Sequence, residues 1–320
     1  MRSSAAFTTA LALFVLTLAP GAGAGEIAGN ISFGKSFWKQ WGDGRAELAT
    51  YELIIPRYGE KRRGTAVSIV IPETFLKSLR VKADRGKHPA QDEFPVLKIN
   101  LIEDFPTGVY DYNLMTTAFT TMAPVDGRPA GSPSKVSFSA QEWCGHAWSQ
   151  FLFDAGSVRF EGHSYFDGEA DESGTLSYPA AGVSEDALLL WARGWAAPRV
   201  GPGEKVEAPV LTSARVARFA HKKAGWSKAI FSRSAKSREV TVPAGTFQAD
   251  VLTVSLEAGR KWTFYVEQGG AHRVLRWETN DGEHADLIAS ERLKYWEMND
   301  ASFVPSLKGL GLEPRPPRTP

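Results

Sequence analysis

Cysteine is almost absent from this chain, in which Cys144 is the only one among 320 residues. A single thiol cannot close an internal disulfide, so packing has to hold the fold together. The chain also lacks a G-x-S-x-G elbow, an H-E-x-x-H helix and a glycine-rich phosphate loop. These absences remove the common signatures of serine hydrolases, zinc proteases and nucleotide-binding proteins. We therefore expect no cofactor.

A strong excess of either charge is missing as well. The formal net charge is +1, which gives the chain no general attraction for nucleic acid. Apolar residues make up 43% of the chain and charged residues 23%, as in ordinary globular proteins. The 10 tryptophans and 18 phenylalanines supply the material for a large core.

The small net charge hides an uneven distribution. Residues 160–192 contain seven acidic residues and no Lys or Arg, whereas residues 208–238 contain eight basic residues and no acidic one. The basic segment could form a face for anionic lipid or polysaccharide. Alternatively, both segments are solvated strand faces that neutralise one another, which is the more usual meaning of such charge runs.

Long apolar runs are confined to the N-terminus. Arg2 precedes an apolar stretch over residues 5–19, and Ala22-Gly23-Ala24 has the pattern of a small-residue cleavage site. This arrangement predicts a secretory signal peptide that is cleaved near Ala24-Gly25, and no cysteine stands there to carry a lipoprotein anchor. No later stretch approaches the roughly 20 apolar residues that a spanning helix needs. We expect an exported, periplasmic protein without a transmembrane segment.

Alternating β-forming residues dominate the rest of the chain. Runs such as "AELATYELII", "TAVSIVI" and "VYDYNLMTTAFTTM" are separated by segments rich in Gly, Pro, Asp and Ser. A parallel sheet would need crossover helices, and the sequence predicts none. The prediction is an all-β fold, an antiparallel meander that forms one or two curved sheets or partly open barrels, with one short helix between the halves.

That helix is predicted after Ser184, which can cap it, and its apolar stretch "ALLLWARGW" ends before Pro198. A strand is expected over residues 207–216. The expected divisions of the chain are a signal peptide at 1–24, an N-terminal antiparallel β region at 25–182, a helix and linker at 183–205, a C-terminal antiparallel β region at 206–298 and an extended tail at 299–320.

The lone thiol lies in the segment "QEWCGHAWSQ". Treated as one extended strand, this segment places Glu142, Cys144 and His146 on the same face. A tight turn at residues 154–157 would pair it with the next strand, and matching the aromatic faces of the two strands fixes the register. The cross-strand neighbours predicted in this way are Cys144 with Asp167, His146 with Tyr165, Trp148 with His163, and Glu142 with Glu169.

This polar cluster allows three interpretations. Cys144, His146 and Asp167 could act as nucleophile, base and orienting acid. Together with His163, the same residues are also acceptable zinc ligands. In the third interpretation they form an ordinary polar sheet face. The residues that we expect to lie near a ligand are Glu142, Trp143, Cys144, His146, Trp148, His163, Tyr165 and Asp167.

Several longer motifs carry a resemblance to a protein family. The motifs "FWKQWGDGRAELATYEL", "PRYGEKRRGTAV", "YDYNLMTTAFT", "QEWCGHAW" and "SYFDGEAD" resemble a family of exported bacterial proteins that has no clearly characterised member. The resemblance covers most of the chain after residue 24. Members often carry the label septum formation inhibitor Maf, although the genuine Maf family resembles a cytosolic nucleotide pyrophosphatase with an N-terminal S-x-S-P-R-R segment. This chain has no such segment, so we do not expect that activity.

The second half of the chain carries a shorter resemblance. Its motifs "VTVPAGTFQADVLTV" and "KWTFYVE" are similar to another exported β-rich bacterial domain family. This resemblance implies a curved sheet or partly closed barrel, and such architectures often hold apolar or amphipathic ligands in the concavity. We therefore expect a non-catalytic periplasmic or envelope-associated protein that binds a lipid or an envelope glycan. The alternative is an enzyme, either a thiol hydrolase or a metal-dependent one, that uses Cys144, His146 and Asp167.

Overall fold

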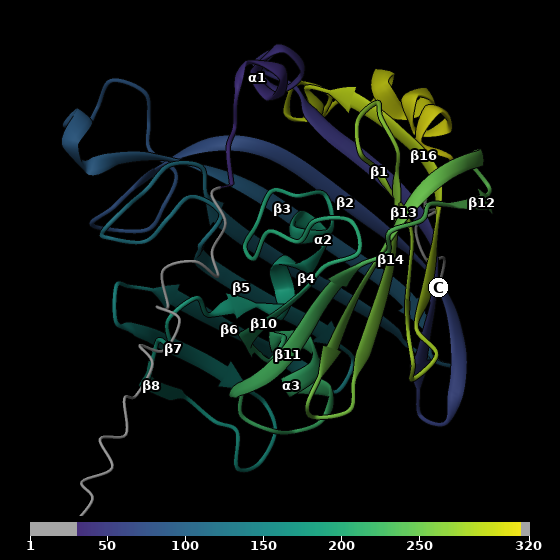
Figure 1. Cartoon of the computed structure of the whole chain (residues 1–320). Helices are drawn as coiled ribbons and strands as arrows, with labels where there is room; N and C mark the ends of the chain where they lie inside the picture. The colour runs from purple at the N-terminus through teal and green to yellow at the C-terminus, as the bar shows by residue number, and fades with distance from the viewer. Residues whose placement is uncertain (1–30, 315–320) are drawn as a thin grey trace, which may run out of the picture.

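The computed structural model describes residues 31–314, so the predicted signal peptide lies outside the described residues. Strands dominate the fold (Figure 1). The strands of the first half are β1 (Ala46–Arg57), β2 (Glu60–Leu76), β3 (Glu93–Pro106), β4 (Asp111–Thr121), β5 (Pro133–Glu142), β6 (Gly145–Phe153), β7 (Ser157–Ser164) and β8 (Glu172–Ser177). Those of the second half are β9 (Val183–Ser184), β10 (Lys205–Leu211), β11 (Trp226–Arg233), β12 (Arg238–Val242), β13 (Gly245–Leu256), β14 (Lys261–Glu267), β15 (Val274–Thr279) and β16 (His284–Leu293).

The helices are short. The α-helices are α1 (Lys35–Trp41), α2 (Leu188–Ala192) and α3 (Ala214–Phe219), and the 3-10 helices are η1 (Ala90–Asp92), η2 (Glu185–Ala187), η3 (Tyr295–Glu297) and η4 (Ala301–Leu310). Within residues 31–314, no helix has both the length and the apolar character that crossing a membrane requires.

All sixteen strands belong to one sheet, which runs as a meander from β8 back to β1 and continues from β16 to β9, with β12 paired to β13. The two halves meet where β1 pairs with β16, from Ala46 opposite Leu293 to Ile54 opposite His284. Every pair is antiparallel except that of the two-residue β9 with β10. The predicted all-β antiparallel fold is confirmed, in the form of one large sheet that does not close into a barrel.

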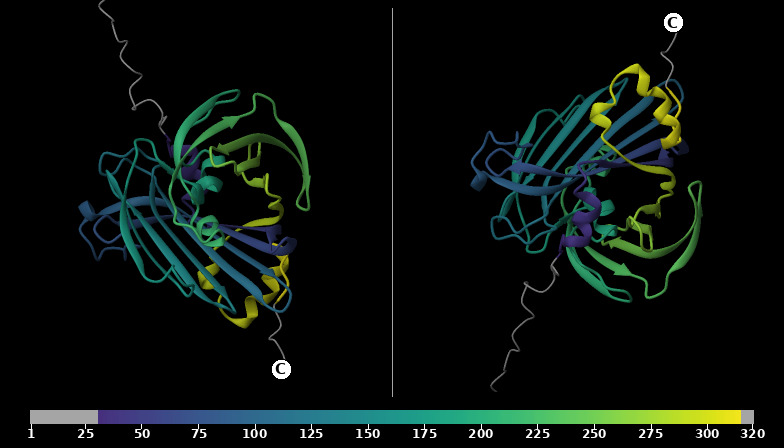
Figure 2. Two further views of the ribbon diagram at one scale, coloured as in Figure 1. Left: turned by 90° about the horizontal axis from the view of Figure 1, so that it is seen from below. Right: turned by 90° about the horizontal axis from the view of Figure 1, so that it is seen from above.

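The sheet curls around its own apolar face, and α2 and α3 lie inside the curve (Figure 2). Aromatic residues fill this interior: the ring of Trp191 in α2 lies 4.9 Å from Phe231 and 6.1 Å from Phe264. The ring of Tyr51 on β1 lies 4.6 Å from Trp277 on β15. Both halves of the sheet therefore contribute to one hydrophobic core.

The predicted helix between the halves is present. The side chain of Ser184 accepts a hydrogen bond from the backbone N–H of Asp186, and η2 and α2 follow directly. This segment enters the curl of the sheet. It therefore buries Leu188, Leu190 and Trp191.

Two predicted elements differ from the structure. The strand expected over residues 207–216 ends with β10 at Leu211, and α3 begins at Ala214. Ser213 causes this change, since its side chain caps α3 by accepting from the N–H of Val216 and donates to the carboxylate of Asp186. The extended tail expected at 299–320 is wrong for Ala301–Leu310, which form η4 with Leu310 buried against the sheet.

Candidate functional site

The hairpin of β6 and β7 carries several of the side chains that the sequence singles out. A two-residue turn at Ala155-Gly156 joins the strands, and Trp148 pairs with His163. One step beyond the last ladder pair, the N–H of Tyr165 donates to the carbonyl of His146 at 3.2 Å. The predicted register is confirmed for Trp148 with His163 and for His146 with Tyr165. The predicted pairs of Cys144 with Asp167 and of Glu142 with Glu169 are wrong, because β7 ends at Ser164 and Cys144 lies before the start of β6.

Cys144 lies in a turn and not on a strand. β5 ends at Glu142 and β6 begins at Gly145, so Trp143 and Cys144 are the two central residues of a hairpin. The prediction of one continuous strand through this segment is wrong. Since Glu142 pairs with Gly145, the carboxylate of Glu142 points into the curl, away from the face that carries His146.

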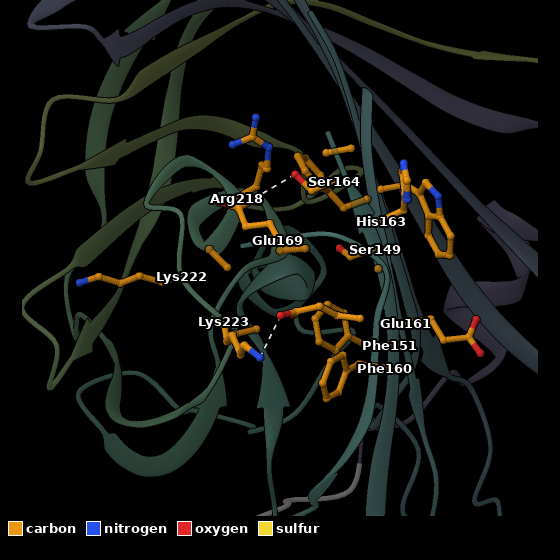
Figure 3. A pocket seen from close by; sticks show the side chains of 18 of the residues that line it. Ser149, Phe151, Phe160, Glu161, His163, Ser164, Glu169, Arg218, Lys222 and Lys223 are labelled. Atoms are coloured by element: carbon orange, nitrogen blue, oxygen red, sulfur yellow. Dashed lines mark hydrogen bonds and ion pairs between the residues drawn. The ribbon is translucent and has the colours of Figure 1, made fainter. Parts of the chain in front are cut away.

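Three of the predicted residues, His146, Trp148 and His163, lie on the outer face of the sheet. Figure 3 shows His163 on the opposite side of the strands from Phe151 and Phe160. His146 and Trp148 are exposed, and the ring of His163 lies 2.5 Å from the carboxylate of Asp171. The structure therefore separates Glu142 from the other polar side chains with which the sequence grouped it.

The described residues do not bring together the side chains that the metal-site and nucleophile interpretations require. Within residues 31–314, no group of three or more His, Cys, Asp and Glu side chains is placed to hold a metal ion. Cys144 is an exposed free thiol. No hydrogen bond joins it to His146 or Asp167 in the described part of the chain. A ligand-binding role for the outer-face residues remains a prediction.

The inner face of the same hairpin borders a cavity of about 230 Å³. One wall is formed by β5, β6, β7 and β8, and the other by α3 and the segment 221–224 that follows it (Figure 3). The elements of this second wall come from the C-terminal half of the chain. The cavity thus lies where one edge of the curled sheet approaches the other half of the fold.

The wall on the sheet side is apolar. Its large side chains are Phe138, Phe151, Phe160 and Leu176, and the rings of Phe151 and Phe160 are stacked with their centroids 6.3 Å apart. Gly174 on β8 packs so closely under the Phe160 ring that a Cβ there would lie 2.7 Å from it. The missing side chain of Gly174 therefore allows Phe160 to lie against the strand.

Arg218 of α3 lies at the opposite end of the cavity from Phe160, whereas Lys223 lies beside Phe151 (Figure 3). One guanidinium nitrogen of Arg218 donates to Glu142 at 2.9 Å, and the guanidinium lies 4.0 Å above the ring of Phe166. The other two nitrogens, Nε and Nη1, are buried and donate no hydrogen bond within residues 31–314. Seven other arginines of the described residues also have a buried nitrogen without a partner, so these donors are available to a polar ligand but do not by themselves mark a site.

The mouth of the cavity is held by one hydrogen bond and one ion pair between the sheet edge and the segment 221–224. The ring of His221 lies 2.5 Å from Glu169, and Lys223 lies 2.9 Å from Glu172. Lys222 is exposed and forms no ion pair in the described part of the chain. Exposed pairs of this type contribute at most about 1 kcal/mol each, so the mouth can open at small cost.

A buried ionic network anchors α3. Arg215 donates to Glu103 on β3 at 3.1 Å and to Glu283 at 2.7 Å, which ties α3 to both halves of the sheet. Burial raises the pKa of Glu103 to about 7 although Arg215 opposes the shift, and burial also raises the pKa of Asp186 to about 6. The two carboxylates on Arg215 in turn raise the pKa of its guanidinium. This network fixes the position from which α3 presents Arg218.

The basic segment at 208–238 therefore divides into two groups. Arg215 and Arg218 are buried and paired with acidic residues on strands far along the chain, whereas Lys222 and Lys223 reach the surface. Part of the expected neutralisation by the acidic segment occurs, through the ion pair of Glu172 with Lys223. Sequence patterns did not identify Arg218 as a cavity residue; the only available signal was the capping residue Ser213.

No family model and no curated protein matches the chain. Among solved structures, the chain is similar to the crystal structure of a beta-barrel-like protein of domain of unknown function DUF1849 from Brucella abortus. The identity is 11%, the match covers 78% of this chain and 98% of that chain, and the TM-score is 0.44. Function therefore has to be inferred from the residues of this chain.

Proposed function

We propose that the protein is a non-catalytic binding protein of the bacterial cell envelope that holds the acyl chain of an anionic amphiphile in the inner cavity. The observation that carries this proposal is the combination of an apolar wall, formed by Phe138, Phe151, Phe160 and Leu176, with cationic groups at the cavity end and mouth. Pockets with a mostly apolar lining and a few placed polar groups are the usual form of small-molecule sites.

The size of the cavity restricts the ligand. Its volume of about 230 Å³ lies below the range of about 300–1,000 Å³ that is typical for drug-sized ligands. One alkyl chain suits such a space better than a complete phospholipid or an oligosaccharide. Of the two ligand classes that the sequence suggests, the cavity therefore favours lipid over glycan.

The cationic groups favour an anionic head. Arg218 has two buried N–H donors to offer, and Lys222 is exposed at the mouth without an ion-pair partner in the described part of the chain. A carboxylate or phosphate can accept from such donors in charge-assisted hydrogen bonds. Export to the periplasm, which the N-terminal segment predicts, belongs to the same proposal, because acyl lipids are plentiful in the cell envelope.

Calorimetric titration of the chain from Gly25 onward with dodecanoate tests the proposal. We expect binding with one dodecanoate per chain, and weaker binding of dodecanol, which has the same alkyl chain and no charge. A matched pair of substitutions on β7 separates the two faces of the sheet. Phe160→Ala, on the inner face, should weaken binding about tenfold, because a buried aromatic side chain contributes roughly 1.5–3 kcal/mol. The backbone of His163 borders the cavity, but its ring points to the outer face (Figure 3), so His163→Ala should leave binding unchanged.

The opposite pattern would overturn the proposal. If neither ligand binds, the proposed ligand class is wrong. If His163→Ala loses binding and Phe160→Ala does not, the ligand binds outside the inner cavity. Circular dichroism of both variants checks that the sheet is retained.

A further inference from the structure

Every second strand connection of the N-terminal meander, four in all, carries one highly exposed apolar or aromatic side chain at its tip. The tips are the connections β1–β2, β3–β4, β5–β6 and β7–β8, and alternation in an antiparallel meander places all four at the same edge of the sheet. The exposed fractions are 55% for Tyr58, 80% for Val109, 64% for Trp143 and 67% for Tyr165. We call these four residues the tip row.

Such residues are unusual at these positions. Hairpin tips prefer Gly, Asn, Asp, Pro and Ser, which solve the geometry of the turn without exposing apolar area. Among the other large hydrophobic side chains of residues 31–314, only Leu79 is more than half exposed. Leu79 lies on the β2–β3 connection, at the opposite edge of the sheet. A concentration of exposed apolar groups at one edge indicates an interaction surface.

The tip row is held in place by contacts between the hairpins. The hydroxyl of Tyr110 donates to that of Tyr58 at 3.3 Å, and the ring of Tyr110 lies 6.5 Å from that of Trp143. At the fourth tip, the Tyr165 ring covers Gly145, where no Cβ would fit. The four tips therefore form one surface whose side chains are positioned before any partner arrives.

We propose that the tip row docks on the surface of a lipid bilayer. Tyrosine and tryptophan are the residues that prefer the membrane–water interface, because each combines an apolar ring with a polar group. The exposed charges at the tips are of both signs, with Lys61 beside Glu60 at the first tip and Asp167 at the fourth. The surface is thus suited to insertion between lipid head groups and not to adsorption on an anionic polymer.

The tip row is also adjacent to the mouth of the inner cavity. Phe166, the neighbour of Tyr165, lies 5.3 Å from the ring of His221 at the cavity mouth. In Figure 1 the blue β1–β2 turn lies at the lower edge of the molecule, while the yellow C-terminal 3-10 helices lie at the top. Docking through the tip row would bring the mouth of the cavity to the bilayer surface. The inference goes beyond the proposed function and rests on different residues.

The lone cysteine provides the reporter for the test. Cys144 is exposed and directly follows Trp143 in the β5–β6 turn, so a nitrobenzoxadiazole dye attached to it lies in the tip row. The labelled chain from Gly25 onward is mixed with vesicles of phosphatidylethanolamine and phosphatidylglycerol, and then with vesicles of phosphatidylcholine alone. We expect a blue shift and increased emission with both, and quenching by nitroxide-labelled lipid.

Substitutions define the surface. Trp143→Ser and Tyr165→Ser should each weaken vesicle co-sedimentation about tenfold, because each removes an aromatic ring that is expected to enter the interface. Trp296→Ser is the matched control, since Trp296 is an exposed tryptophan of η3 at the other edge and its loss should not change binding. A second control carries the dye at position 301 in a Cys144→Ser, Ala301→Cys chain, where no blue shift is expected.

The inference is wrong if the chain binds neither kind of vesicle. It is also wrong if Trp143→Ser and Trp296→Ser bind vesicles equally well. Binding that moderate salt abolishes would indicate adsorption by charge and would overturn it as well. Dodecanoate titration without membranes reports on the inner cavity separately, so failure of one proposal is distinguishable from failure of the other.

Discussion

Arg218 and Glu142 form a buried ion pair 2.9 Å long, which joins α3 of the C-terminal half to the end of β5 in the N-terminal half. Their side chains are only 7% and 3% exposed. Since neither charge can reach water, each depends on the other for compensation. Arg218 lines the inner cavity, so the pair links the stability of the fold to the shape of the proposed site.

The first prediction concerns this pair. Glu142→Leu leaves the guanidinium of Arg218 without a carboxylate partner and should lower the free energy of unfolding by about 3–5 kcal/mol. The double variant Glu142→Leu, Arg218→Met removes both charges and should recover most of that loss. Urea unfolding of the unchanged chain, the single variant and the double variant measures the three free energies of unfolding. Equal destabilisation in the single and double variants would show that the pair has no coupling.

The second prediction concerns the dependence of stability on pH. Burial raises the pKa of Glu103 from 4.5 to about 7 and that of Asp186 from 3.8 to about 6. Both carboxyl groups therefore bind a proton more tightly in the folded chain than in the unfolded chain. Their contribution to stability is fully present below the unfolded values and is lost as the pH rises through 6 and 7.

Glu103→Gln should reduce the loss of stability with rising pH, because the amide side chain does not titrate. Urea unfolding at about pH 5 and about pH 8 measures the difference between the two conditions. We expect the loss of stability with rising pH to be smaller in the variant than in the unchanged chain. An identical loss in both chains would contradict the assignment of the slope to Glu103.

The third prediction concerns the mouth of the cavity. Glu172 holds Lys223 in an ion pair and also places negative charge where an anionic head group is expected. Glu172→Gln should release Lys223 and tighten dodecanoate binding by about threefold to tenfold, while stability changes by less than about 1 kcal/mol. Dodecanol should not respond, since it carries no charge. Weaker binding of dodecanoate would place its carboxylate away from this mouth.

The fourth prediction concerns the exposed thiol. Cys144 lies in a turn at the edge of the sheet and does not line the inner cavity. Alkylation with iodoacetamide should therefore leave dodecanoate binding unchanged within about twofold, as titration before and after modification would show. A large loss of dodecanoate binding after alkylation would show that Cys144 lies at the ligand site and would contradict this prediction.

The β6–β7 hairpin shows what the sequence could predict. Its register follows from the aromatic residues, because a slip by one position would turn Phe151 and Phe160 to the solvent. The adjacent turn could not be predicted in the same way. Trp143 and Cys144 lack the usual chemistry of a two-residue turn, so the segment resembled one long strand and the orientation of Glu142 was reversed.

The cavity itself depends on contacts that no local pattern encodes. Arg218 pairs with Glu142 across 76 residues, and Arg215 pairs with Glu103 across 112. In the sequence these arginines are part of a basic run whose usual meaning is solvation. Only the curl of the sheet, which brings α3 against β5, gives them partners.

Photo-crosslinking tests the central claim most directly. A fatty acid with a diazirine at the end of its alkyl chain is bound and irradiated, and the attachment sites are identified by mass spectrometry of peptides. Insertion at Phe151, Phe160 or Leu176 is the result that the inner cavity predicts. Insertion confined to Leu152 or Arg159, which pair on the outer face of the same hairpin and do not line the cavity, would contradict it.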